Sequence, residues 1–269
     1  MDSPHLRHGY RLHHESIADC VLSLFTLHNE TLNVWSHVVA AVYCGLLFSD
    51  LHFDGEVSGS FAHQMDLLMV SVATAASVFT YILSAVFHLF CCMSADAHRT
   101  LLILDLLGVL SIILSFYFSG LYFGFYFHPA ICLAYMLSVA AMSALAVAAA
   151  VVPWMRANRP LRSLIFALLA ASGFLPMAHW MLIRPAAEVV AFLPPFLTMY
   201  ALLGLGFFFF ITHIPERFFP SSQAVSVLCS SHTLWHVLVA FATAQMYYVA
   251  LGYSKHVQML TFQQQTSSN

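Results

Sequence analysis

Five polar side chains that are costly to place in a lipid bilayer interrupt apolar stretches of the sequence: Ser84, His88, Asp105, His232 and His236. His232 and His236 are four residues apart, so on a helix both imidazoles project from one face and can reach one metal ion. His88, from a neighbouring helix, would complete the three-ligand set of a catalytic zinc and leave a position for water. The spacing predicts a Zn²⁺ site held by these three histidines.

Zinc at such a site lowers the pKa of a bound water and polarises a carbonyl, which is the chemistry of amide or ester hydrolysis. Asp105 would orient that water or act as the base. Ser84, one helical turn from His88, would support that ligand or bind substrate. The alternative is that the five groups only form hydrogen bonds between helices.

Membrane helices are the elements that must position these residues. Hydrophobic residues make up 61% of the chain, charged residues 8%, and the mean hydropathy is +0.82, whereas soluble domains are about half apolar and about a quarter charged. We predict an all-α bundle of seven transmembrane helices, over residues 34–51, 67–92, 101–123, 131–152, 161–183, 189–211 and 225–251. The few charges form no basic surface, which argues against nucleic acid as a partner.

The distribution of basic residues predicts the orientation, because Lys and Arg are retained on the cytosolic side. With the N-terminus inside, the outside segments hold only Arg184 and Lys255. The inside segments hold Arg7, Arg11, Arg99, Arg156, Arg159, Arg162 and Arg217. We expect a short cytosolic tail over residues 1–28, a membrane domain over 29–253, and a short outside or lumenal tail over 254–269.

This topology brings the polar groups to one level of the membrane. His88 lies about 6 Å from the cytosolic end of the second helix, and Asp105 at a similar depth in the third. If the seventh helix begins near residue 225, His232 and His236 lie roughly 10 to 16 Å from its start. The groups are therefore expected in one layer near the cytosolic face.

Three further polar residues, Glu30, Asn33 and His37, lie at the cytosolic start of the first helix. Thr31 or Asn33 can cap this helix, and Glu30 favours its N-terminal dipole. We interpret the group mainly as a cap. A supporting or gating contribution beside the metal ligands stays open, and His213 at the end of the sixth helix is a reserve ligand.

The sequence resembles the progestin and adipoQ receptor family, which includes the adiponectin receptors and, more distantly, the haemolysin III proteins. The resemblance covers residues 9–253 and rests on four segments: NETLNVWSH over 29–37, SxxxH over 84–88 with Asp105 following, IPERFFP over 214–220 and SHTLWH over 231–236. It implies a seven-helix bundle with a cytosolic N-terminus and zinc on the three histidines, with the aspartate and the serine nearby.

Members of this family are linked to ceramidase-like hydrolysis of sphingolipid amides, and some are described as receptors for adiponectin or steroids. Trp180, Trp235 and residues 161–166 look closest to the Golgi member that traps Raf kinase. The short N-terminal tail departs from that member and from the adiponectin receptors, which puts kinase or adaptor binding through it in doubt. Leu106 stands where a tyrosine is common, which alters the pocket without removing a ligand.

Three functions compete at this point. A zinc amidohydrolase would act on a membrane lipid, with ceramide, a free fatty acid or a sphingoid base as its lipid partner. A receptor or scaffold would use zinc structurally and bind an extracellular or cytosolic protein, although the outer loops are short. Metal transport would need polar groups on both sides of the membrane midplane, whereas the cluster here is expected near the cytosolic face alone. Transport is therefore the least favoured of the three. In each case the chain is an integral, multi-pass protein of the plasma membrane or of the Golgi and other endomembranes.

Overall fold

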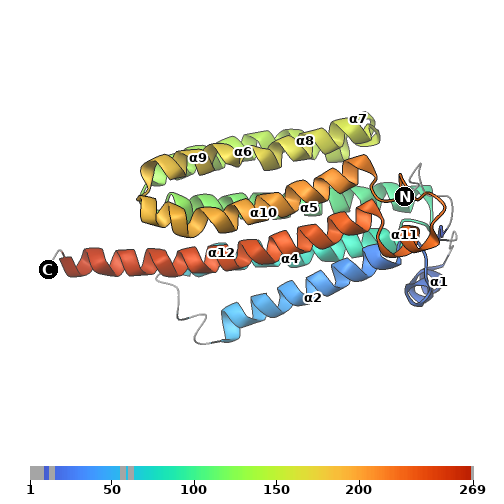
Figure 1. Cartoon of the computed structure of the whole chain (residues 1–269), viewed down its shortest axis with the longest axis horizontal. Coiled ribbons are helices and arrows are strands. Elements are labelled where there is room, and N and C mark those ends of the chain that lie inside the picture. Colours follow the sequence, from blue (N-terminus) through green and yellow to red (C-terminus); the bar gives the residue numbers. More distant parts are fainter. Residues whose placement is uncertain (1–8, 12–15, 55–58, 60–63, 268–269) are drawn as a thin grey trace. The chain divides into compact units, whose positions relative to one another are not determined.

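The computed structural model describes residues 9–11, 16–54, 59 and 64–267, and every regular element in these ranges is a helix (Figure 1). Seven segments are long and apolar enough to cross a membrane, which confirms the predicted number of spans. They are α2 (Thr31–Phe53), α4 (Gln64–Phe90), α5 (Ala95–Gly124), α6 (Pro129–Val151), α8 with α9 (Arg159–Ile183), α10 (Ala186–Thr212) and the segment from α11 into α12 (Gln223–Gln263). Arg7, which was counted among the inside basic residues, lies outside the described residues.

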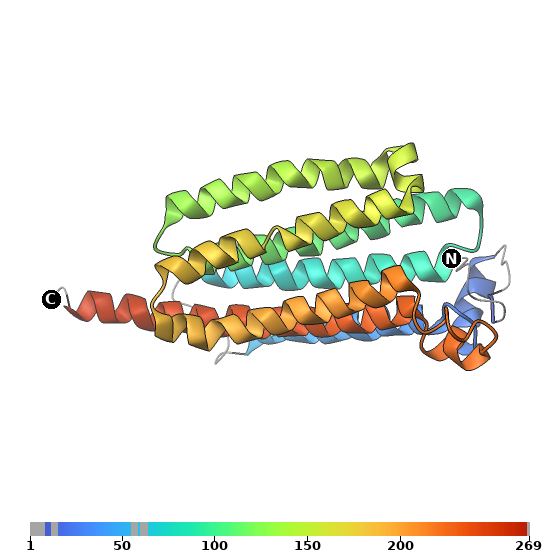
Figure 2. The ribbon, with the colours of Figure 1, turned by 45° about the horizontal axis from the view of Figure 1, so that its top comes forward.

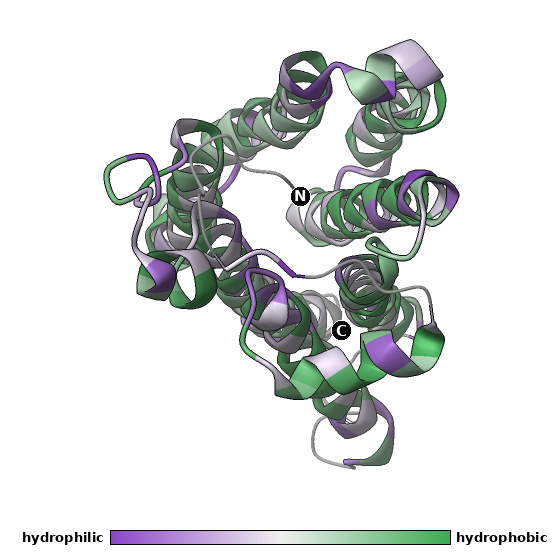
Figure 3. Ribbon diagram, turned by 90° about the vertical axis from the view of Figure 1, so that its right-hand side faces the viewer, coloured by the Kyte–Doolittle hydropathy of each residue, from purple (hydrophilic) through white to green (hydrophobic). Residues whose placement is uncertain are grey.

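Hydrophobic residues dominate these helices, and hydrophilic residues gather mostly in the connecting segments (Figure 3). Large apolar side chains such as Leu133, Leu205 and Phe241 are exposed on the helix surfaces. In lipid such side chains need no protein partner, whereas the backbone does need its internal hydrogen bonds, which a helix supplies. The pattern is that of helices surrounded by hydrocarbon.

The chain divides into two compact units that share five of the helices. The first unit comprises residues 1–43, 78–108 and 197–245, and the second comprises 44–77, 109–196 and 246–269. Helices α2, α4, α5, α10 and α12 each contribute one stretch to each unit. All eight candidate site residues belong to the first unit.

The second unit contains the side-by-side pair α6 and α8 (Figures 1 and 2). Ala146 and Ala149 of α6 are completely buried in the small core between these helices, together with Ile165 and Leu169 of α8. Small side chains let two helix backbones approach closely, which gives the packing contact that replaces the hydrophobic effect inside lipid.

The fifth span is two helices where one was predicted. Helix α8 (Arg159–Ala171) ends at Ser172, and α9 (Phe174–Ile183) begins after Gly173. The Tyr117 hydroxyl of α5 donates to the Leu169 carbonyl over 2.7 Å and lies 2.8 Å from the Ser172 hydroxyl. The tyrosine thus supplies a hydrogen bond to backbone that the interruption leaves without its helical partner.

The seventh span also differs from the single helix predicted over 225–251. A short helix, α11 (Gln223–Leu228), is followed by a break, and α12 runs from Ser231 to Ser267. The Ser230 hydroxyl accepts a hydrogen bond from the Thr233 N–H, as an N-cap does. His232 therefore lies in the first turn of its helix, which corrects the depth of 10 to 16 Å. At its other end α12 continues through most of residues 254–269, the segment predicted as a tail.

Helices α4 and α5 approach closely within the first unit, near the candidate site. The Thr80 hydroxyl donates to the Gly108 carbonyl over 2.7 Å. A Cβ atom at Gly108 would lie 3.3 Å from the Thr80 Cα atom, which is backbone and cannot rotate away. A side chain at Gly108 would thus press against the backbone of α4.

We predict that Gly108→Val lowers the free energy of unfolding by about 1 to 3 kcal/mol, because the added methyl groups must separate α4 from α5. Thermal unfolding of the purified protein measures the effect. Gly204→Val is the matched control, since a Cβ at Gly204 has no atom within 4 Å. Equal melting temperatures for the two variants would contradict the close approach.

Candidate metal centre

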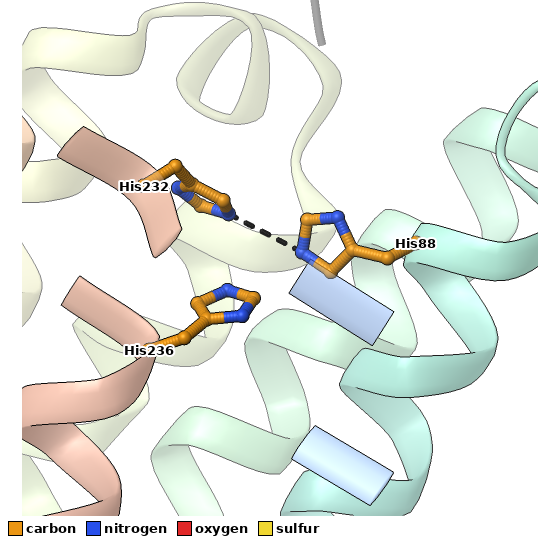
Figure 4. A group of neighbouring side chains, drawn as sticks. All are labelled: His88, His232 and His236. Carbon is orange, nitrogen blue, oxygen red and sulfur yellow. Dashed lines mark hydrogen bonds between the residues drawn. The ribbon is translucent and has the colours of Figure 1, made fainter. Parts of the chain in front are cut away.

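Three imidazoles from two helices converge in the first unit (Figure 4). His88 lies in the last turn of α4, and His232 and His236 lie on one face of the first turns of α12. One nitrogen from each ring lies within 4.8 Å of the nitrogens of the other two. His88 and His236 are buried, and His232 is half-buried.

The hydrogen bonds of His88 show which of its nitrogens faces the cluster. Its Nδ1 lies 2.7 Å from a carboxylate oxygen of Glu30, and its Nε2 lies 3.2 Å from the Nε2 of His232. A carboxylate can only accept, so Nδ1 of His88 carries the proton and Nε2 presents its lone pair. A ligand histidine whose outer N–H donates to a carboxylate is the usual arrangement in metal sites.

His236 is oriented in the same way by the start of α2. Its Nδ1 lies 3.3 Å from the Asn33 carbonyl oxygen and 3.4 Å from the Ser36 hydroxyl. The Asn33 carbonyl can only accept, which again places the proton on Nδ1 and leaves Nε2 for the cluster. The Asn33 side-chain oxygen accepts from the Thr233 hydroxyl over 2.8 Å, so α2 and α12 are joined beside the ligand.

One pair of donor nitrogens has the separation that a zinc ion requires. Two nitrogens that each lie about 2.0 to 2.1 Å from one tetrahedral zinc ion are about 3.3 Å apart. The observed distance of 3.2 Å between the Nε2 atoms of His88 and His232 meets this requirement. Three imidazole ligands on a tetrahedral zinc ion would leave a fourth position for water or substrate.

Glu30 is held beside His88 by further hydrogen bonds. It is 3% exposed, and the Asn33 side-chain amide donates to the same carboxylate over 2.9 Å. Burial by itself raises the pKa of Glu30, but the hydrogen bond and charge interaction with His88, together with the Asn33 donor, outweigh burial and hold that pKa below its usual range. The carboxylate is therefore ionised where it meets the imidazole.

Arg11 anchors the end of α4 that carries His88. Its guanidinium donates to the His88 carbonyl over 3.1 Å and to the Leu89 carbonyl over 2.6 Å. Its backbone N–H donates to the Asn29 side-chain oxygen over 2.9 Å. The last carbonyls of a helix lack helical partners, so a cation there stabilises the helix end. This contact fixes the ligand-bearing turn against the segment that leads into α2.

Glu216 is a positioning residue that the sequence argument missed. It is 2% exposed, and its carboxylate accepts from the Ser231 N–H over 2.8 Å and from the Ser231 hydroxyl. An acidic group at a helix N-terminus satisfies orphan N–H groups and favours the helix dipole. In the sequence, Glu216 is visible only as an acidic residue fifteen positions before α12 begins. The reserve ligand His213 lies 3.9 Å from Glu216 and is outside the three-histidine cluster.

The other predicted site residues also belong to the first unit. Asp105 is half-buried on α5, and Ser84 is buried one turn before His88 on α4. His37 is buried on α2, with its ring stacked on that of His236. The metal-ligand cluster among the described residues contains the three histidines alone. The catalytic roles of Asp105 and Ser84 stay predictions.

Comparison with known proteins identifies one matching family and several similar proteins. The model of the family described as haemolysin-III related matches residues 25–247. Progestin and adipoQ receptor family member 3 from Homo sapiens is 32% identical over 249 residues, covering 88% of this chain and 77% of that protein. Heptahelical transmembrane protein 1 from Arabidopsis thaliana is 27% identical, covering 88% and 73%. The adiponectin receptor protein of Drosophila melanogaster is 27% identical, covering 92% and 55%.

Replacing Glu30 by Gln is expected to weaken metal binding by about 10- to 100-fold, because the His88 imidazole loses its charged acceptor. Competition with a zinc chelator measures the affinity. Asp19→Asn is the control, because Asp19 is an exposed acid bonded to Ser16 in the first short helix, α1 (Ile17–Leu22). Identical zinc affinities for wild type, Glu30→Gln and Asp19→Asn would show that Glu30 does not support the ligand.

Glu216→Gln is expected to lower the free energy of unfolding by about 1 to 3 kcal/mol, since an amide nitrogen replaces one acceptor that faces Ser231. Zinc affinity should fall as well, because the first turn of α12 carries His232. Thermal unfolding and chelator competition report the two effects. A variant that keeps the wild-type values of both would rule out this positioning role.

Proposed function

The chain belongs to the haemolysin-III related family and to the progestin and adipoQ receptor family, and from that premise we propose that this multi-pass membrane protein is a zinc-dependent amidohydrolase of ceramide-like lipids. The observation that carries the proposal is the separation of 3.2 Å between the Nε2 atoms of His88 and His232, with His236 beside them. Three imidazoles with one open position make a catalytic type of site. The choice of ceramide follows the family resemblance.

Zinc, when bound, supplies Lewis-acid activation of a water and of the lipid carbonyl. His88, His232 and His236 would hold it through Nε2, and Glu30 and Asn33 keep the rings of His88 and His236 in that direction. Asp105 accepts the proton that the water loses as it adds to the amide carbon. Asp105 then returns this proton to the amide nitrogen as the C–N bond breaks, which releases a fatty acid and a sphingoid base.

The environment of the site suits a lipid substrate. The helices that carry the ligands expose apolar side chains, among them Phe79 and Ile82 of α4 and Phe241 of α12. An acyl chain can therefore remain in hydrocarbon while its amide group meets the histidines. With the N-terminus cytosolic, as the basic residues favour, hydrolysis takes place in the inner half of the membrane.

The test is fatty acid release from ceramide by purified protein in lipid nanodiscs. We expect release by wild type, loss on treatment with a strong chelator and recovery on adding zinc. His232→Ala should abolish release, and Asp105→Asn should lower kcat by about 10²- to 10⁴-fold because the proton acceptor is gone. Asp96→Asn is the control, since Asp96 is an exposed residue of the same helix paired with Arg99.

Unchanged release by both site variants would exclude hydrolysis at this centre. The second candidate is a receptor without catalysis, in which a bound metal only joins α4 to α12. Two of the relatives are named as receptors, which supports this second candidate. Absence of release by wild type, with ligand-dependent signalling intact in cells, would select the receptor.

A further inference from the structure

His37 is a buried imidazole beside the metal centre whose nitrogens have no hydrogen-bond partner within the described part of the chain. Its ring contacts the rings of Tyr81 and His236, with centroid distances of 5.0 Å and 3.7 Å. The residue is only 6% exposed. Burial of a polar group without a partner is unfavourable, and most such groups in folded proteins are paired. A partner from outside the chain would explain its presence here.

The stacking on His236 excludes His37 as a fourth ligand of the same ion. The two rings are nearly parallel, with 14° between their planes. An imidazole lone pair lies in the plane of its ring, so an ion bound to Nε2 of His236 lies in the plane of His236. The parallel plane of His37 passes too far from that point for a Zn–N bond of about 2 Å. His37 therefore lies beside the cluster without being a ligand of that ion.

We propose that His37 is a substrate-binding residue that donates its N–H to the carbonyl oxygen of the lipid amide, an inference that rests on the proposed function. A neutral imidazole carries one donor and one acceptor. The polar head of an N-acylated, hydroxylated lipid offers groups that match both. As water adds to the carbonyl carbon, negative charge develops on this oxygen, and a fixed donor stabilises that charge.

The position of His37 on α2 supports this assignment. His37 lies one helical turn after Asn33, on the face that Asn33 turns toward α12. The same helix face therefore orients a ligand through Asn33 and presents a free hydrogen-bonding group through His37. Stacking on His236 and a tilted contact with Tyr81 fix the plane of the ring without using either nitrogen.

The informative variant is His37→Phe, which keeps a ring for stacking and removes both nitrogens. We expect unchanged zinc affinity, a lipid-free melting temperature about 2 to 4 °C higher, and a kcat lower by about 100-fold with little change in KM. His37→Gln, which restores a donor and an acceptor, should recover part of kcat. A gain in stability combined with a loss of kcat is the pattern of a functional group that folding does not need.

His28→Phe is the matched control for stability. His28 is also 6% exposed, but its Nε2 lies 3.1 Å from the Ser23 carbonyl oxygen and its Nδ1 accepts from the Glu30 N–H over 3.1 Å. Removing a partnered imidazole should lower the melting temperature. A fall for His37→Phe of the same size, a loss of zinc affinity, or a wild-type kcat would each overturn the proposal.

The failure of hydrolysis itself is separable from the failure of this inference. If wild type releases no fatty acid, the proposed function is wrong. The affinity of zinc-loaded wild type and of zinc-loaded His37→Phe for intact ceramide then tests the role of His37 by itself. Binding at least 10-fold weaker in the variant keeps His37 as a lipid-binding residue. Equal affinities reject it.

Discussion

The hydrogen bonds from the start of α2 to two imidazoles are the constraint on which the metal centre depends. A buried imidazole can rotate and can carry its proton on either nitrogen, so three histidines in proximity are not yet a site. Glu30 accepts a hydrogen bond from the Nδ1–H of His88, and the Asn33 carbonyl accepts one from the Nδ1–H of His236. Both Nε2 atoms are thereby directed inward with their lone pairs available.

The same segment connects the helices that carry the ligands. Asn33 contacts α12 through Thr233, and the Asn29 side chain accepts from Arg11, whose guanidinium binds the end of α4. The first turn of α2 and the residues before it thus contact the ends of α4 and α12 that carry the histidine ligands. This explains why a polar run stands at the beginning of an otherwise apolar helix.

The sequence predicted the number of spans and the three-histidine cluster, because membrane length and the cost of polar groups in lipid act locally and leave a visible pattern. It interpreted Glu30 mainly as a helix cap and left a supporting contribution open, and the structure places the Glu30 carboxylate 2.7 Å from Nδ1 of His88. A cap and a partner of His88 have the same sequence signal, an acid before a helix. Only the arrangement of α2 beside α4 distinguishes the two roles.

The convergence was also predicted from a helix start that is wrong. Ser230 and Glu216 begin α12 at Ser231, six residues later than expected, so His232 lies at the end of its helix as His88 does. The three histidines still converge, because His88 and His232 both lie close to the ends of their helices. Neither the break after Leu228 nor the distant acid that caps α12 could be found from hydropathy, since both depend on contacts far apart in the chain.

X-ray absorption spectroscopy of the purified, zinc-supplemented protein tests the central claim most directly. One zinc ion per chain, with three imidazole nitrogens at about 2.0 Å and one oxygen, is the ligand shell that the geometry predicts. A shell containing sulfur, a shell with fewer than three imidazoles, or protein that retains no zinc would contradict it.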